Sequence, residues 1–101
     1  MELKVTLQTE RGVTLEKVFD PQNLVHRVLP EDESGFNYLP YIDWYGDTTF
    51  NQLQMTPFIA EWDRLLAQTP SGDIREFLEE IKCLALRCQE AVHLHLKFIG
   101  D

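Results

Sequence analysis

Cysteine is scarce in this sequence, which contains only Cys83 and Cys88. Both lie in a stretch with the apolar spacing of a helix, where a separation of five residues corresponds to about 7.5 Å along the axis and about 140° around it. A disulfide cannot span that arrangement. We therefore expect two reduced thiols, with Cys88 on the buried side of its helix.

Long hydrophobic runs are also missing. No apolar stretch approaches the roughly 18 to 20 residues that a membrane-spanning helix requires. The first twelve residues, MELKVTLQTERG, alternate polar and apolar types and lack the charged-then-apolar order of a signal peptide. The expected location is the cytoplasm, with no membrane partner.

Basic residues are few: 9 lysines and arginines stand against 17 aspartates and glutamates, for a net charge of −8 and a pI of about 4.7. An average surface of that sign repels nucleic acid and anionic membranes, so neither is expected as a partner. A basic protein is the electrostatic complement. Between residues 20 and 50 a single basic residue, Arg27, accompanies six acids: Asp20, Glu31, Asp32, Glu33, Asp43 and Asp47.

Known catalytic and cofactor motifs are absent as well. The sequence has no glycine-rich phosphate loop, no nucleophile elbow and no zinc-finger spacing. It therefore predicts no cofactor and no catalytic residue.

What is present is the pattern of one α+β domain spanning residues 1–101. Residues 3–9 and 93–99 alternate apolar and polar types as half-buried strands do, and residues 57–68 and 74–91 have helical apolar spacing. The prediction is a small antiparallel or mixed sheet, made of an N-terminal hairpin and a C-terminal strand beside the first, packed on two amphipathic helices. The further expected elements are a strand over 13–19, a helix over 21–29, a loop over 31–35, a strand over 41–45, and a helical turn over 50–54. The helices at 57–68 and 74–91 are expected to be capped by Thr56 and Asp73.

Aromatic residues are concentrated in one segment: six of the eleven lie between Phe36 and Phe50. So much ring area must be packed against the core or offered to a partner. Rings rimmed by carboxylates have the composition of a protein-recognition surface, with aromatic anchors and acids that steer a basic partner. The residues predicted to bind a partner are Tyr38, Tyr41, Asp43, Trp44, Tyr45 and Asp47. The alternative is that half or more of these rings simply close the core.

A second hypothesis is a small metal-assisted hydrolase. It would use Asp43, Asp47 and His93 or His95. The two histidines project from the same face of the predicted strand and could hold Zn²⁺ if a third ligand came from elsewhere, the available carboxylates being Asp43, Asp47 and Asp101. A polar residue on the outer face of a strand explains both histidines without a metal. An aspartate at position 43, inside a predicted strand, is disfavoured and needs a partner. The hydrolase requires these side chains to lie within about 5 Å of one another.

The segment IDWYGDTTFNQLQ resembles a D-x-Y-G-D-T-x-F-N-x-L-Q pattern of small uncharacterised bacterial proteins of about this length. The matching positions are Asp43, Tyr45, Gly46, Asp47, Thr48, Phe50, Asn51, Leu53 and Gln54. The closing HLHLKFIGD is similar to the ends of those proteins. The resemblance implies no activity, cofactor or partner. Where those proteins tend to have D-P-Y, this chain has Trp44 in place of the proline.

The favoured hypothesis is a non-enzymatic protein-interaction module, for instance an immunity or antitoxin-like protein whose acidic aromatic surface masks a basic effector. A homodimer that uses the aromatic segment as its own interface is a further possibility.

Overall fold

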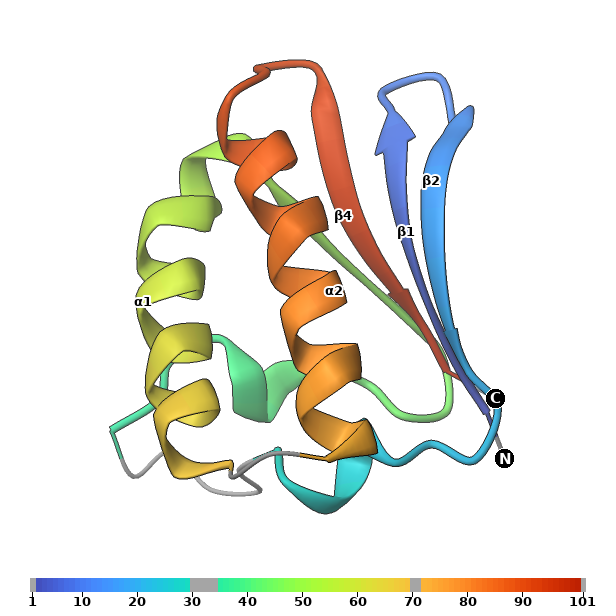
Figure 1. Ribbon diagram of the computed structural model, residues 1–101. Coiled ribbons are helices and arrows are strands. Elements are labelled where there is room, and N and C mark those ends of the chain that lie inside the picture. Colours follow the sequence, from blue (N-terminus) through green and yellow to red (C-terminus); the bar gives the residue numbers. More distant parts are fainter. Residues whose placement is uncertain (1, 30–34, 70–71, 101) are drawn as a thin grey trace.

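The sheet is antiparallel and has four strands in the order β2-β1-β4-β3. In the computed structural model, which describes residues 2–29, 35–69 and 72–100, the strands are β1 (Leu3–Thr9), β2 (Thr14–Asp20), β3 (Asp47–Asn51) and β4 (Leu94–Ile99) (Figure 1). The predicted hairpin and the pairing of the last strand beside the first are both confirmed. The predicted loop at 31–35 lies outside the described residues except for Gly35.

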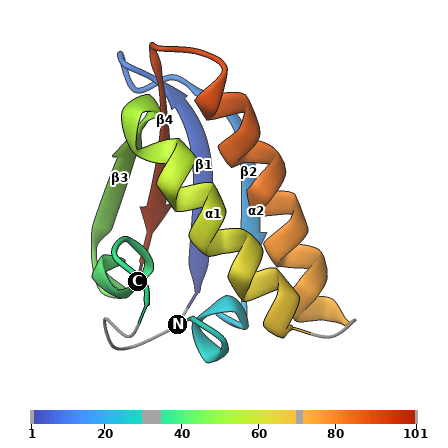
Figure 2. The same cartoon turned by 90° about the vertical axis from the view of Figure 1, so that its left-hand side faces the viewer.

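The helices α1 (Gln52–Gln68) and α2 (Asp73–Gln89) run antiparallel across the same face of the sheet (Figure 2). The predicted α+β class, with two amphipathic helices on a small sheet, is therefore confirmed. In the described part of the chain, no helix is long and apolar enough to span a membrane.

The start of α1 differs from the prediction. Asn51 is its N-cap: the Asn51 side chain accepts a bond from the backbone of Gln54, and the Gln54 side chain accepts one from the backbone of Asn51. This capping box satisfies two otherwise unpaired backbone donors. The start predicted at Pro57, with Thr56 as its cap, is wrong. A helix does begin near residue 51, where a separate helical turn over 50–54 was expected, but it continues without a break to Gln68.

The N-cap of α2 lies one residue before the predicted one. Gly72, with φ at +134°, is the N-cap and gives no side-chain bond, so Asp73 is the first helical residue instead. Asp73 and Glu76 occupy the first turn of α2. Carboxylates there are favoured by the positive end of the helix dipole.

Two predicted elements are wrong. The helix expected over Pro21–Leu29 is reduced to a 3-10 turn, η1 (Val25–Arg27), because Asn23 adopts a left-handed φ of 52° that no α-helix can include. The strand expected over Tyr41–Tyr45 is replaced by a second 3-10 turn, η2 (Leu39–Tyr41), and a tight turn. The strand of this region lies a few residues later, as β3.

The core fills the space between the sheet and the helices. Val5, Leu7, Leu96 and Phe98 project from the sheet toward α1 and α2, and all are fully buried. Trp62 is buried among them and donates a 2.8 Å hydrogen bond from Nε1 to the Leu78 carbonyl. That bond satisfies the indole N–H and ties α1 to α2.

The two thiols should differ in reactivity, because Cys83 is exposed and Cys88 is buried. Burial raises the pKa of the Cys88 thiol from 9.0 to about 11, an effect that a backbone hydrogen bond with Leu96 partly offsets. At about pH 8 we expect a thiol reagent to modify Cys83 quickly and Cys88 only after denaturation, because the thiolate is the reactive form. Two equally fast thiols in the native protein, or a fast phase that persists in Cys83→Ser, where only Cys88 remains, would contradict this assignment.

The same shift affects stability. The unfolded chain loses its Cys88 proton near pH 9, whereas the folded chain keeps it until about pH 11. The contribution of this thiol is therefore fully present below pH 9 and is lost as the pH rises through that window. Urea unfolding of the wild type and of Cys88→Ala between pH 8 and pH 11 measures this contribution. It is the difference between the two proteins in the slope of the free energy of unfolding against pH.

Candidate functional site

Glu61 holds the start of the aromatic segment in place. Its carboxylate, 6% exposed, accepts backbone hydrogen bonds from Asn37 at 2.8 Å, Tyr38 at 3.0 Å and Leu39 at 3.3 Å. Three such bonds replace the water that a buried carboxylate loses. The burial of Glu61 is unusual, because a charged residue of an amphipathic helix normally lies on its exposed face.

Two of the four rings predicted to bind a partner, Tyr38 and Trp44, pack against the rest of the molecule instead. Tyr38 packs edge-on against Phe50 with 6.3 Å between ring centroids, and Phe50 is buried against Phe58 and Phe98. Trp44 is half-buried and stacks on His26 of η1 at 4.2 Å. Tyr38 and Trp44 therefore join the segment to the rest of the molecule.

The other two rings are exposed. Tyr41 is 61% and Tyr45 is 75% accessible. Tyr41 precedes a turn at residues 43–46, and Tyr45 lies within that turn, where the Asp43 carboxylate accepts the backbone N–H of Tyr45 at 2.9 Å. The Asp43 N–H donates to the Thr48 hydroxyl at 2.8 Å. Asp43 thus has the partners that it was expected to need, and they fix the turn that presents Tyr45.

Asp47 begins β3 and forms an ion pair with Lys97 at 3.3 Å. Asp43 and Asp47 are both exposed, as a steering role requires. The three acids Glu31, Asp32 and Glu33, expected at the rim of this surface, lie outside the described residues.

The groups needed for the hydrolase are not brought together. Asp47 lies opposite Ile99 in the sheet, whereas His95 lies opposite Asn51 at the other end of the same strand pair. His93 contacts Glu10 at 3.2 Å, beside the hairpin turn. Across residues 2–29, 35–69 and 72–100, no group of three or more histidine, cysteine or acidic side chains could hold a metal ion.

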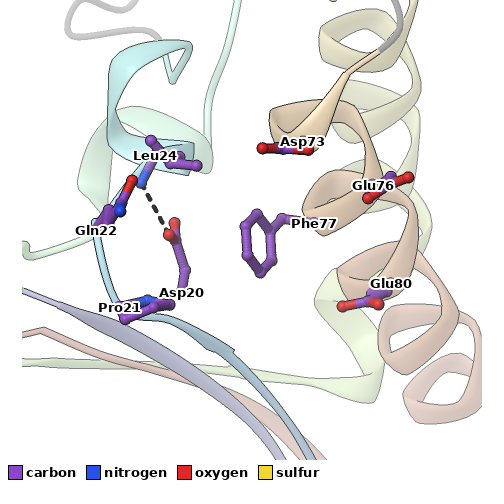
Figure 3. A pocket seen from close by; sticks show the side chains of 8 residues that line it. All are labelled: Asp20, Pro21, Gln22, Leu24, Asp73, Glu76, Phe77 and Glu80. Carbon is purple, nitrogen blue, oxygen red and sulfur yellow. Dashed lines mark hydrogen bonds between the residues drawn. The ribbon is translucent and has the colours of Figure 1, made fainter.

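A pocket that sequence reasoning did not find lies between the end of β2, the residues leading into η1, and the first turns of α2 (Figure 3). Its volume is about 420 Å³. Phe77 points from α2 toward Asp20, and acidic side chains lie around the ring. Among the described residues, four carboxylates and no basic side chain line this pocket; the acids are Asp20, Asp73, Glu76 and Glu80.

The four acids have different roles. Asp20 is 1% exposed, and its two oxygens accept the backbone N–H groups of Leu24 and Val25, each at 2.9 Å. It therefore shapes the wall of the pocket. Asp73, Glu76 and Glu80 are exposed on α2, at spacings of three and four residues that place them on one side of the helix. That spacing around Phe77 was the available sequence signal. The position of Asp20 near these α2 residues depends on η1 and could not be predicted from the sequence.

The pocket and the exposed tyrosines lie at the same end of the molecule. Figures 1 and 2 both show η1, η2, the segment leading into β3 and the first turn of α2 at the end where the chain termini also lie. The link is η1: Leu24, which precedes it, lines the pocket, and His26 within it stacks on Trp44. We call this the acidic end, defined by Tyr41, Tyr45, Asp73, Glu76, Phe77 and Glu80.

No family model, curated protein or solved structure matches this chain.

Proposed function

We propose that this chain is a small non-enzymatic interaction module that binds a basic protein partner at its acidic end. The observation that carries the proposal is the pocket of four carboxylates around Phe77. A lysine or arginine side chain entering such a pocket would meet acids that pair with its charge and an aromatic ring that attracts cations. This is the chemistry expected of an immunity or antitoxin-like protein that covers a basic effector.

The exposed tyrosines supply the second part of the interface. Tyrosine offers a large contact area with few rotatable bonds, and it is enriched among the residues that dominate binding energy. Tyr45 stands on a turn fixed by Asp43 and Thr48, so little flexibility is lost on binding. The pocket provides charge selectivity, and Tyr41 and Tyr45 provide apolar contact.

The test is a differential capture experiment. The wild-type chain and the double variant Glu76→Gln/Glu80→Gln are immobilised, and proteins from cells that encode the chain are passed over both. We expect a basic protein to be retained by the wild type and largely lost from the variant. Its purified complex should weaken about tenfold in the variant, mostly through a slower association rate, with a smaller salt dependence.

The matched control is Glu79→Gln/Glu90→Gln, which removes the same charge from exposed positions of α2 and its C-terminal cap, outside the pocket. This control should retain the partner. Equal loss from both double variants would show that only net charge matters, and retention of no basic protein by the wild type would refute the proposal. Tyr45→Ala tests the aromatic part separately, with weaker binding expected through faster dissociation.

A further inference from the structure

The face of the sheet opposite the helices is open. In Figure 1 both helices lie on one side of the sheet, and the described chain places no helix over the other side. Alternate strand residues project from that side, and the strand register aligns them in two central rows. One row is Lys17, Thr6 and Lys97, and the next is Phe19, Lys4 and Ile99; we call these six residues the open face.

The open face has the opposite charge to the rest of the protein. Three of the four lysines in the sequence, Lys4, Lys17 and Lys97, project from it. Asp47 is the one carboxylate among the described strand residues that share this side, and it pairs with Lys97. Three lysines against one aspartate give this side a formal charge of +2, which leaves −10 for the remainder of a chain whose net charge is −8.

Thr6 lies at the centre of the open face with an unused hydroxyl. It is 2% exposed, and its Oγ1 has no hydrogen-bond partner in the described part of the structure. In the sheet it lies between Lys17 and Lys97. A buried hydroxyl without a partner is unfavourable in the free protein. An anionic oxygen placed between the two lysine side chains would accept a bond from it and pair with both charges.

We propose that the open face binds a short acidic segment of a protein partner, rich in aspartate or glutamate. Lys17 and Lys97 lie on the two neighbours of β1, so their Cα atoms are about 10 Å apart. Carboxylates three residues apart in a polyproline II segment lie on one side at about 9 Å, because that helix has three residues per turn and rises about 3.1 Å per residue. This surface is distinct from the acidic end, and the proposal does not depend on the proposed function.

Nucleic acid suits the open face less well. Single-stranded RNA or DNA is held on a sheet by aromatic rings that stack successive bases. The open face offers one ring, Phe19 on the edge strand β2, and a further ring on this side of the sheet, His95 on β4, is two rows of the register away from it. A longer polyanion would also extend beyond the lysines and meet the strongly acidic remainder of the surface. A compact acidic segment avoids that repulsion.

The experiment is an NMR titration of the isotopically labelled chain with a hexaglutamate peptide, at about 25 and 150 mM salt. We expect saturable shifts at Thr6 and its neighbours on β1 and β4. Lys17→Gln should weaken binding about fivefold, and Lys17→Gln/Lys97→Gln should abolish it. Thr6→Val, which keeps the shape and removes the hydroxyl, should weaken binding while leaving the fold intact. A twelve-nucleotide oligouridine serves as the competing probe.

Lys82→Gln is the matched control, because it changes the net charge equally at the one remaining lysine, which is on α2 and pairs with Asp63. It should bind the peptide like the wild type. Three results would overturn the proposal: no saturable shifts, an equal loss in Lys82→Gln, or tighter binding of oligouridine than of hexaglutamate. None of these results bears on the pocket around Phe77, so the two proposals fail separately.

Discussion

Replacing Glu61 with glutamine is expected to lower the free energy of unfolding by about 2–4 kcal/mol, because buried backbone donors would lose a charged acceptor. The two carboxylate oxygens together accept three N–H groups, from residues 37, 38 and 39. A glutamine has one carbonyl oxygen, and its amide nitrogen would face at least one backbone donor. The measurement is urea unfolding by linear extrapolation, with hydrogen exchange of residues 36–39 to locate the loss.

Glu79→Gln is the matched control. Glu79 is exposed and pairs with Arg75 one turn away at 3.1 Å. Ion pairs of this kind contribute little, so the expected change is below about 0.5 kcal/mol. If Glu61→Gln proved as mild as this control, or if exchange at residues 36–39 did not increase, Glu61 would not be the anchor of the aromatic segment.

Glu61 also shows how far the apolar spacing could be followed in the sequence. Phe58, Trp62 and Leu65 form the buried stripe of α1, and position 61 falls on the same side by helical spacing. The spacing therefore indicated burial, while the charge of the residue suggested exposure. The Glu61 carboxylate accepts N–H groups from a segment more than 20 residues earlier in the chain. No pattern in the sequence around residue 61 indicates a contact over that separation.

Strands β1, β2 and β4 and helix α2 were predictable because their signals are local, whereas β3 and the start of α1 were not found. Strands β1 and β4 alternate cleanly, and α2 repeats its apolar positions over almost five turns. The two irregular segments were not predictable in this way. Around η1 the chain has the composition of a helix, but Asp20 accepts the N–H groups of Leu24 and Val25 and Asn23 adopts a left-handed conformation. These contacts depend on a buried carboxylate at the end of β2.

The candidate site was predictable in part. Clustering of aromatic residues indicated the segment that contains Tyr41 and Tyr45, and both rings are exposed. The clustering could not distinguish these exposed rings from Tyr38 and Trp44. Those two are less exposed because they pack against Phe50 and His26. The pocket around Phe77 and the open face each combine residues distant in the sequence. Both required the tertiary structure.

Of the glycine-to-alanine substitutions at described positions, Gly100→Ala should disturb the turn at residues 43–46 most. A Cβ at position 100 would overlap the backbone carbonyl of Trp44 and lie 2.9 Å from the backbone carbonyl oxygen of Asp43. The Gly100 N–H also donates to the Gly46 carbonyl at 2.7 Å, so the end of the chain and the turn are held together. Backbone atoms cannot move aside as a flexible side chain can. We expect a loss of about 1–3 kcal/mol in the free energy of unfolding.

The local readout distinguishes this effect from general destabilisation. Amide resonances of residues 43–46 should shift in Gly100→Ala, and partner binding through Tyr45 should weaken because its turn is displaced. Gly12→Ala is the control: its φ of +86° makes an alanine there cost about 1–2 kcal/mol, but no atom lies within 4 Å of the added Cβ. It should lose similar stability while residues 43–46 keep their resonances. Unshifted resonances at residues 43–46 in Gly100→Ala would mean that the chain end does not position the turn, and that Asp43 and Thr48 suffice to present Tyr45.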